Sequence, residues 1–358
     1  MEDYFDIAFY QNQKLKYDRY KVVGVLILIK LVCYGVRESE VKYFNKLNTY
    51  NYDLKLINKN LNDENVKEAI GADSIMVRGN CKADRKNLEL LKNSGLQYVL
   101  TRTVGFNHVD LNAAKDLDLK VARVPGYSPN AISELAVTLA MMLLRHTAYT
   151  VNRTKDKNFL VDGFMFSKEI RNCTVGIIGA GRIGLTTAKL FKGLGAKVLA
   201  YDVFQSDMAK EIVEFKSLDE VLKESDVISV HMPYIKGQNY HLINREFISK
   251  MKDDSILINT ARGELQDLEA IANAIENGKI SGFGTDVIEG EAEVFFKDLS
   301  NEKIENKIVE RLIGLYPKVL ITPHIGSYTD EALTNMISIS YDNMNEFLKE
   351  GKCKNEIA

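Results

Sequence analysis

Short apolar runs alternate with helix-like patterns along the chain from about residue 30 onward. The first series of strand-like runs, many of them rich in β-branched residues, covers residues 30–36, 53–58, 74–79, 96–103 and 119–126. Helical patterns separate several of these runs, for example at 38–48. Repeated strand–helix units predict a parallel sheet with helices on both of its faces.

A long helix is predicted after this first series. Ser128 can cap it, Pro129 suits its first turn, and the long apolar run that follows indicates that most of the helix is buried. A second series of strand-like runs then covers residues 174–178, 197–202, 226–233, 255–260, 280–287 and 318–322. Six strands with helices between them describe a doubly wound nucleotide-binding domain. Residues 329–351 have the pattern of an amphipathic helix.

The composition leaves room for two domains and argues against charged macromolecular partners. Hydrophobic residues make up 46% of the 358 positions, which is enough for two buried cores. The 47 basic and 49 acidic residues nearly cancel, so neither nucleic acid nor an anionic membrane is expected as a partner. The longest apolar run, 22–36, contains Lys30 and is too short to span a membrane.

The cysteines indicate neither a metal site nor a disulfide framework. They lie far apart and form no CxxC pair: Cys33, Cys81, Cys173 and Cys353. We therefore expect no metal and a reducing, cytoplasmic location. Residues 1–21 are aromatic and of mixed charge, and they lack the features of a secretory signal.

A glycine-rich motif lies between the first strand and the first helix of the second series. The sequence GAGRIG begins at Gly179 and fits G-x-G-x-x-G, and the strand before it and the helix after it supply the required context. Gly179 permits a tight turn, Gly181 lets the backbone approach a pyrophosphate, and Gly184 lets helix and strand pack closely. Asp202 ends the next strand, where a carboxylate binds a ribose diol and repels a 2′-phosphate. This pattern predicts NAD as the cofactor.

Three later strand-like runs are each followed by one ionisable side chain, namely Arg262, Glu291 and His324. If these strands share one parallel sheet, the three side chains meet at its carboxyl edge, where such sheets bind ligands. An arginine fork grips a carboxylate, a histidine can protonate a carbonyl oxygen, and a carboxylate can orient the imidazole. Together with a nicotinamide, this set predicts reduction of a 2-oxo acid.

Each of the three residues, taken alone, is more commonly a surface or structural group. Glu289 fits the spacing as well as Glu291 does. Their joint occurrence after a dinucleotide-binding motif favours a catalytic set. Among the other histidines, His231 could line the cofactor site, His241 is expected in an exposed loop, and His108 stays open near a predicted substrate loop.

The sequence also resembles a known family. GAGRIG, YDVF, SVHMP, NTARGE, DVIEGE and TPHIGSYT are similar to motifs of the D-isomer-specific 2-hydroxyacid dehydrogenases, in their D-lactate dehydrogenase branch. The resemblance covers nearly everything from Lys30 to the end. It implies an α/β fold of two doubly wound parallel-sheet domains. A Rossmann-type NAD domain (128–326) would be inserted into a flavodoxin-like substrate domain (29–127 plus 327–358).

The resemblance also implies roles for individual residues. Arg262 would bind the substrate carboxylate, His324 would donate the proton, and Glu291 rather than Glu289 would be its partner. The implied cofactor contacts are Arg182, Ile183, Met232, Pro233, Asn239, Thr260, Ala261 and Asp286. The implied substrate contacts are Val104, Gly105, Tyr127 and Tyr328. Homodimers joined through the long helix at 129–146 are expected.

A narrower similarity links CYGVRE, VRGNC, NAISELAV and LYPKVLITPHIGSYTDEA to (R)-2-hydroxyglutarate dehydrogenases. It implies 2-oxoglutarate as the substrate, whose second carboxylate needs a cation or several donors because an unpaired buried charge is costly. Arg78, after a predicted strand, is the candidate for that cation, with a salt bridge at the strand end as its alternative role. Gly126 offers no side chain and leaves room for a bulkier apolar substrate.

Three alternatives therefore stay open. D-lactate, phenyllactate or 2-hydroxyisocaproate could be the product of the same chemistry. A NAD-responsive binding protein could also use this fold without catalysis. Finally, residues 1–28 have no counterpart in the family pattern. They are either a native extension or the result of a start site placed too far upstream. We expect weak order up to about residue 20.

Overall fold

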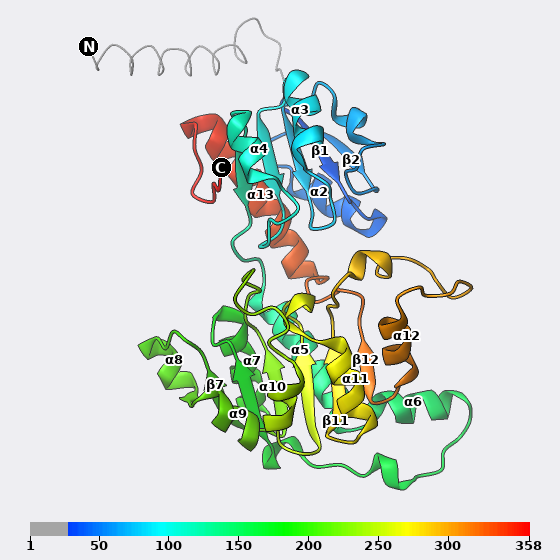
Figure 1. Ribbon diagram of the computed structural model, residues 1–358. Coiled ribbons are helices and arrows are strands. Elements are labelled where there is room, and N and C mark those ends of the chain that lie inside the picture. The colour runs from blue at the N-terminus through cyan, green and yellow to red at the C-terminus, as the bar shows by residue number, and fades with distance from the viewer. Residues whose placement is uncertain (1–27) are drawn as a thin grey trace, which may run out of the picture. The chain divides into compact units, whose positions relative to one another are not determined.

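The computed structural model describes residues 28–358 (Figure 1). The expectation of weak order up to about residue 20 lies outside the described residues. The chain divides into two compact units. Unit 1 contains the described residues up to Ser128 together with Thr329–Ala358, and unit 2 is Pro129–Tyr328.

Unit 1 is built on a sheet of five parallel strands in the order β2-β1-β3-β4-β5. This is the strand order of flavodoxin-like doubly wound sheets. The strands are β1 (Lys30–Tyr34), β2 (Asp53–Ile57), β3 (Ser74–Val77), β4 (Tyr98–Thr101) and β5 (Lys120–Arg123).

Helices cover both faces of this sheet, and each face has its own apolar cluster. Leu88 and Leu91 of α3 pack into one cluster, and Ile337 and Phe347 of α13 pack into the other. Asp84 caps α3 and Thr329 caps α13 by accepting backbone N–H groups. The helical segments are η1 (Glu38–Glu40), α2 (Val41–Leu47), η2 (Val66–Ala69), α3 (Arg85–Asn93), α4 (Leu111–Asp116) and α13 (Asp330–Glu350).

Unit 2 is built on a sheet of seven parallel strands in the order β12-β11-β10-β9-β6-β7-β8. The order in which successive strands are added to the sheet reverses between β6 and β9, as in dinucleotide-binding folds. The two-residue β8 is the one strand that the sequence did not predict. The strands are β6 (Thr174–Ile178), β7 (Lys197–Tyr201), β8 (Glu214–Phe215), β9 (Val227–Val230), β10 (Ser255–Asn259), β11 (Ile280–Thr285) and β12 (Val319–Ile321).

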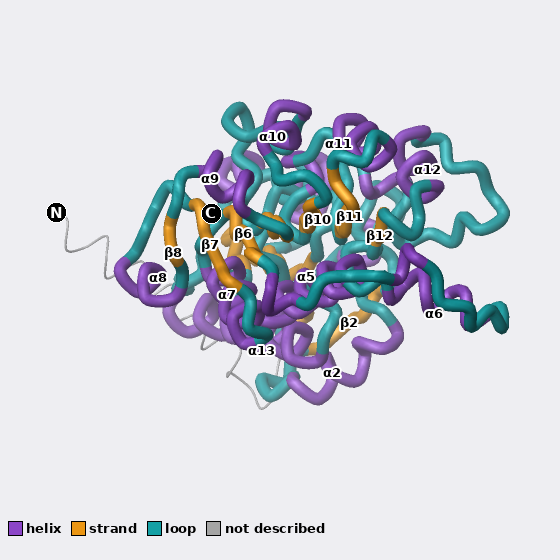
Figure 2. The backbone as a smooth tube through the Cα atoms, turned by 90° about the horizontal axis from the view of Figure 1, so that it is seen from below, coloured by secondary structure: helices purple, strands orange, loops and turns teal. Residues whose placement is uncertain are grey.

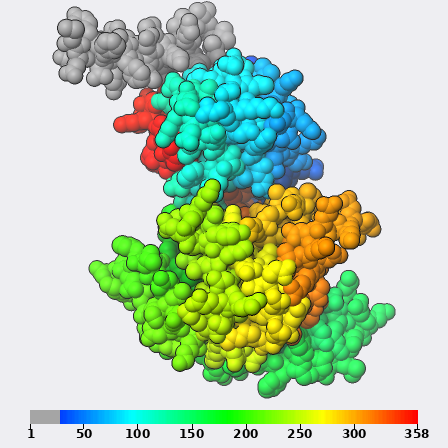
Figure 3. Space-filling model, viewed as in Figure 1, coloured from blue at the N-terminus to red at the C-terminus, as the bar shows by residue number. Residues whose placement is uncertain are grey.

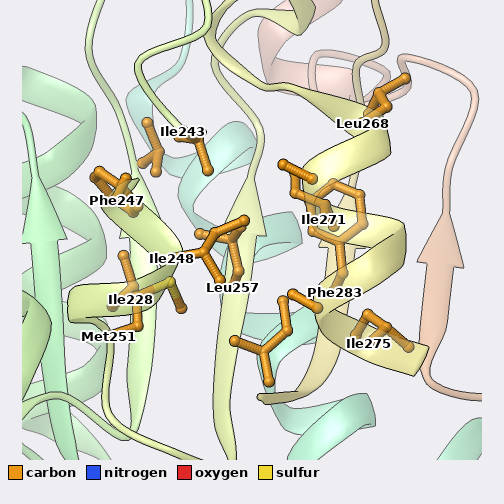
Figure 4. Close-up of a cluster of buried hydrophobic side chains, with 14 of the residues drawn as sticks. Ile228, Ile243, Phe247, Ile248, Met251, Leu257, Leu268, Ile271, Ile275 and Phe283 are labelled. Atoms are coloured by element: carbon orange, nitrogen blue, oxygen red, sulfur yellow. The ribbon is translucent and has the colours of Figure 1, made fainter. Parts of the chain in front are cut away.

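The helices of unit 2 also cover both faces of the sheet, and Figure 2 shows them on either side of the strands. Helices α9 to α12 contribute to one cluster, in which Leu257 and Ile271 gather near Phe283 (Figure 4). Helices α5 and α7 contribute to the other. The helical segments are α5 (Pro129–Leu144), α6 (Thr147–Lys155), η3 (Gly163–Met165), η4 (Ile170–Asn172), α7 (Arg182–Gly193), α8 (Asp207–Ile212), α9 (Leu218–Glu224), α10 (Arg245–Lys250), η5 (Gly263–Leu265), α11 (Leu268–Glu276), η6 (Glu291–Glu293) and α12 (Lys307–Gly314).

The predicted long helix is α5, which ends at Leu144. The backbone turns at His146, which has a positive φ of 51° and precedes the separate helix α6. Helix α5 packs closely on β11, because a Cβ on Gly282 or Gly284 would lie 3.1 Å from atoms of Leu143 or Leu139. Among the helices of residues 28–358, none has the length and apolar character needed to cross a membrane.

Candidate active site

The glycine-rich motif forms the turn between β6 and α7, and two of its glycines are required by close contacts. A Cβ on Gly179 would lie 2.9 Å from the backbone of His231 and Met232, and φ at Gly179 is +95°. A Cβ on Gly184 would lie 1.9 Å from the carbonyl oxygen of Gly179. At Gly181, an added Cβ would meet no atom of the described residues within 4 Å. The turn is therefore tight on one side and open at Gly181.

The open side of the turn is the N-terminus of α7. Gly181 is the N-cap and offers no side chain to the N–H groups of the first turn, where Arg182 and Ile183 lie. Such groups, together with the helix dipole, favour an anion. The fold thus places Gly181, Arg182 and Ile183 where the sequence predicts a pyrophosphate.

Asp202 lies beside this turn, immediately after β7. Its Oδ2 accepts the N–H of Ala180 at 2.6 Å, and its Oδ1 accepts the N–H of Phe204 at 2.8 Å. An ionised carboxylate has about four acceptor positions, so each oxygen can still accept a hydroxyl group. The position and the remaining acceptor capacity fit a ribose diol.

The loops after β9 and β10 hold the other predicted cofactor residues. The Asn239 side chain donates to the Pro233 carbonyl at 2.8 Å and accepts the Ile235 N–H at 2.7 Å, which closes the loop that follows Met232. Thr260 Oγ1, next to Ala261, is buried and has no hydrogen-bond partner within residues 28–358. Buried polar atoms without a partner are uncommon, and a ligand is one way to satisfy them. The donor set and the glycine turn fit a dinucleotide.

The catalytic candidates lie in the segments that follow three neighbouring strands, β10, β11 and β12. His324 Nδ1 is 2.7 Å from Glu291 Oε1, and φ at His324 is +53°. The Glu291 carboxylate therefore holds Nδ1–H and leaves Nε2 as the nitrogen that can pass a proton to a substrate. The His324 side chain is 40% exposed and accessible to a ligand. Arg262 is exposed after β10, and its Nη1 donates to the Ala261 carbonyl at 2.6 Å.

Asp286 fixes the turn that carries His324. This carboxylate is 2% exposed. Its Oδ1 accepts the Thr322 hydroxyl at 2.6 Å and the Ile325 N–H at 2.8 Å, and its Oδ2 accepts the Gly326 N–H at 2.8 Å. Burial raises the pKa of Asp286, and these hydrogen bonds oppose that rise. The contacts shown are with the His324 turn, and a position beside the nicotinamide stays a prediction.

A second histidine–carboxylate pair lies near the first. His241 was expected in an exposed loop; its side chain is 33% exposed, and its Nε2 is 2.9 Å from Glu289 Oε2. The two carboxylates that fitted the sequence spacing equally well therefore have different partners: Glu291 contacts His324, and Glu289 contacts His241. His231 has a different environment: its Nε2 is 2.8 Å from Ser229 Oγ, and burial lowers its pKa to about 3.

The predicted substrate loop of unit 1 follows β4. Thr103 Oγ1 donates to the Gly105 carbonyl at 2.6 Å, and Arg123 Nη1 donates to the Val104 carbonyl at 3.2 Å. These bonds use carbonyl oxygens, so they do not involve the N–H groups predicted to bind a carboxylate. His108 closes the loop, with its Nε2 3.0 Å from Thr101 Oγ1, and burial lowers its pKa to about 4.

The two tyrosines predicted as substrate contacts, Tyr127 and Tyr328, both lie in loops. The Tyr127 carbonyl accepts the Asn335 side chain at 2.6 Å within unit 1. Tyr328 is 47% exposed at the end of unit 2. Their role in lining a substrate pocket stays a prediction.

Arg78 belongs to a cluster of three arginines that sequence reasoning found only in part. Arg102 is 2.9 Å from Glu40, Arg37 is 3.3 Å from the same carboxylate, and Arg78 and Arg102 both donate to the Gly35 carbonyl. Burial and the charges of Arg102 and Arg37 lower the pKa of Arg78 to about 10. Three guanidinium groups therefore lie close to the Glu40 carboxylate at this edge of the sheet.

Comparison with known proteins identifies the family. Residues 137–326 match the model of the D-isomer specific 2-hydroxyacid dehydrogenase, NAD binding domain. An aromatic 2-oxoacid reductase of Clostridium sporogenes is 42% identical over 92% of this chain and 99% of its own length. A D-lactate dehydrogenase of Escherichia coli is 37% identical over 92% of this chain and 100% of its own length.

A solved structure agrees with these sequence relatives. The D-lactate dehydrogenase of Treponema pallidum has a TM-score of 0.83 and 34% identity, covering 92% of this chain and 99% of its own. The predictions of the fold, of an NAD-dependent oxidoreductase and of the broad family are confirmed. These three relatives are named for aromatic 2-oxo acids and D-lactate, and the narrower similarity to 2-hydroxyglutarate dehydrogenases stays a prediction. The chain belongs to the D-isomer specific 2-hydroxyacid dehydrogenase family.

Proposed function

We propose that this enzyme reduces 2-oxoglutarate to (R)-2-hydroxyglutarate, with NADH as the reductant. The observation that supports the choice of substrate is the cluster of three guanidinium groups, Arg37, Arg78 and Arg102, near Glu40. A 2-oxo acid with one carboxylate needs one cationic group, and a dicarboxylate needs a second cation or several donors.

The residues of unit 2 account for the reaction itself. Arg262 binds the 1-carboxylate through paired charge-assisted hydrogen bonds and polarises the 2-oxo group. His324 Nε2 gives its proton to the carbonyl oxygen, and Glu291 orients the ring through Nδ1. NADH, when bound, supplies the hydride for the 2-carbon. The proposed cofactor contacts are Gly179, Gly181, Arg182, Ile183, Gly184, Asp202, Met232, Pro233, Asn239, Thr260, Ala261 and Asp286.

Recognition of the rest of the substrate is assigned to unit 1. Arg78 binds the second carboxylate, and the N–H groups of Val104 and Gly105 assist with the first. A partly buried guanidinium close to two others is held at an electrostatic cost, which an incoming anion relieves. Tyr127 and Tyr328 provide apolar walls.

An aromatic 2-oxo acid is the second candidate substrate. The relative with 42% identity is named an aromatic 2-oxoacid reductase, and Gly126 leaves space beside Tyr127 because it has no side chain. D-lactate is a further candidate product of the same chemistry, since a relative with 37% identity is named D-lactate dehydrogenase. 2-Hydroxyisocaproate is another product that the same reaction would give.

A substrate panel tests these proposals. NADH absorbance is followed with 2-oxoglutarate, phenylpyruvate, 2-oxoisocaproate and pyruvate, and kcat/KM is compared. We expect the highest value with 2-oxoglutarate. A higher value with phenylpyruvate overturns the dicarboxylate proposal in favour of the aromatic one. NADH binding without turnover on all four acids favours a NAD-responsive binding protein and contradicts the enzymatic assignment.

We also propose that the enzyme is a cytoplasmic homodimer. All four cysteines are free thiols, as a reducing compartment requires.

After α6, Phe159, Val161 and Phe166 are 76%, 85% and 89% exposed on a segment that stands out from unit 2 (green in Figure 3). Helices α5 and α6 also line an open cavity of about 420 Å³, whose walls are Met142, Thr147, Ala148, Val151, Asn152, Lys155 and Tyr316.

A second copy of the chain is the occupant that we propose for this surface. Exposed apolar side chains and an apolar cavity on the same unit suit a two-fold contact, in which each copy covers the other. Sedimentation equilibrium should give a dimer for the wild type and a monomer for the double variant Phe159→Ser, Phe166→Ser. A wild-type monomer at micromolar concentration contradicts the proposal.

A further inference from the structure

Two consecutive side chains of unit 2 grip both oxygens of one carboxylate. His241 Nε2 lies 2.9 Å from Glu289 Oε2, and the Tyr240 hydroxyl donates to Glu289 Oε1 at 3.0 Å and Oε2 at 3.2 Å. The rings of Tyr240 and His241 stack with their centroids 3.9 Å apart, so each ring supports the other. We refer to Tyr240, His241 and Glu289 as the clamp.

One side of the clamp is attached to the segment that follows Arg262. The His241 N–H donates to the Glu264 carbonyl at 2.9 Å, and the Ile243 N–H donates to the Leu265 carbonyl at 2.8 Å. These bonds run along η5, which begins directly after Arg262. The rings of the clamp are therefore fixed relative to the backbone that carries the carboxylate-binding guanidinium.

The other side of the clamp is two residues from Glu291. Gly290 lies between the two carboxylates, has a φ of +73° and would meet no atom of the described residues if it carried a Cβ. This glycine provides little restraint of its own. The backbone just before Glu289 is packed tightly, because a Cβ on Gly263 would lie 2.2 Å from the Ile288 carbonyl carbon. Glu289 is thus the last side chain that is held before the backbone reaches Glu291.

We propose that the clamp is a positioning device, which sets the place of Glu291 relative to Arg262 and so aligns His324 for proton transfer. The clamp touches neither the reacting atoms nor Nε2 of His324. Its loss lets the backbone at Gly290 turn and carry the Glu291 carboxylate away from His324 Nδ1. The proposal rests on the function proposed above, because it assigns His324 the proton transfer.

The exposure of the clamp separates this role from a role in stability. The side chains of His241 and Glu289 are 33% and 41% exposed, and Tyr240 is 51% exposed. Ion pairs and hydrogen bonds at such positions contribute little to folding. Removing the clamp should therefore change turnover far more than it changes the melting temperature.

Four variants of the full-length enzyme test the clamp in steady-state kinetics with NADH and the best 2-oxo acid. Glu289→Ala and His241→Ala should each lower kcat about tenfold, with KM for NADH within about twofold and Tm within about 3 °C. Glu289→Gln should recover most of the loss, because its amide oxygen still accepts from Tyr240. The matched control is Glu293→Ala, which removes an exposed carboxylate from η6, the short helix that begins at Glu291. This variant should leave kcat unchanged.

A double variant tests whether the two residues act as one device. Glu289→Ala combined with His241→Ala should lower kcat by the same factor of about ten, because coupled partners are not additive. A fall of about a hundredfold means independent effects and overturns the proposal. An unchanged kcat with a raised KM for NADH also overturns it, since the loop would then serve the cofactor instead.

A measurement without turnover keeps this result apart from the substrate assignment. The chain has five histidines, so the imidazole ¹H–¹⁵N signals can be assigned by single substitutions. The Nδ1–H signal of His324 should be resolved in the wild type and lost or broadened in Glu289→Ala. An unchanged signal contradicts the clamp, whichever 2-oxo acid the enzyme reduces.

Discussion

The carboxyl edges of the two sheets carry charges of different kinds. In unit 2, the segments after β10, β11 and β12 supply Arg262, Glu291 and His324, and the side chains of the last two are 2.7 Å apart. In unit 1, the segments after β1, β3 and β4 bring Arg37, Arg78 and Arg102 near the carboxylate of Glu40.

This difference separates reaction from recognition. A histidine paired with a carboxylate can hold and release a proton near neutral pH. A guanidinium stays charged, and Arg78 does so even with its pKa lowered to about 10, so the cluster in unit 1 can bind an anion but cannot exchange a proton. Variants in unit 2 should therefore affect all substrates, and variants in the arginine cluster should affect only some.

The largest effect is expected at His324. The variant His324→Ala removes the proton donor and should lower kcat by about a hundredfold or more on every 2-oxo acid, which is the usual contribution of a positioned general acid. NADH binding, followed by fluorescence titration, should be unchanged and serves as the control. Turnover within tenfold of the wild type would falsify the assigned role.

A nearly equal effect is expected at Arg262. The variant Arg262→Gln replaces a charged fork with a neutral amide, so kcat/KM should fall about a hundredfold for mono- and dicarboxylates alike. Kinetics with pyruvate and 2-oxoglutarate measure this directly. The comparison between the units breaks down if only one of the two substrates is affected.

A smaller, pH-dependent effect is expected at His108, which is neutral in the folded state. Burial lowers its pKa from 6.5 to about 4, so the unfolded chain binds a proton that the folded chain does not bind between these values. Stability contributed by neutral His108 is present above pH 6.5 and is lost as the pH falls toward 4. Thermal melts at pH 7 and pH 5 should show a smaller decrease in Tm for His108→Gln than for the wild type. Equal decreases would argue against a neutral, buried imidazole.

Much of unit 2 could be predicted from sequence because its chemistry is written in short local motifs. Gly184, which leaves space for the Gly179 carbonyl, and Asp202, which follows a strand, can each be recognised from a few neighbouring residues in the sequence. The carboxyl ends of parallel strands also lie at one edge of the sheet, which is why Arg262, Glu291 and His324 could be grouped from the sequence alone.

The rest depends on contacts between distant segments. Spacing could not separate Glu289 from Glu291, because the choice depends on a loop some 48 residues away that brings His241 to one of them. The same holds for the pairing of Arg102 with Glu40 over 62 residues, and for Asp286, whose bonds to the His324 turn span 36 to 40 residues. The break in the long helix after Leu144 carries no proline or glycine signal in the sequence.

The division between reaction and recognition is tested most directly by one ratio, kcat/KM for 2-oxoglutarate over kcat/KM for phenylpyruvate. It is measured for the wild type, Arg262→Gln and Arg78→Gln. We predict that the ratio is unchanged in Arg262→Gln and falls about thirtyfold in Arg78→Gln, because only the latter loses a charged contact specific to the dicarboxylate. A ratio that Arg78→Gln leaves at the wild-type value, or that both variants change equally, would contradict the account.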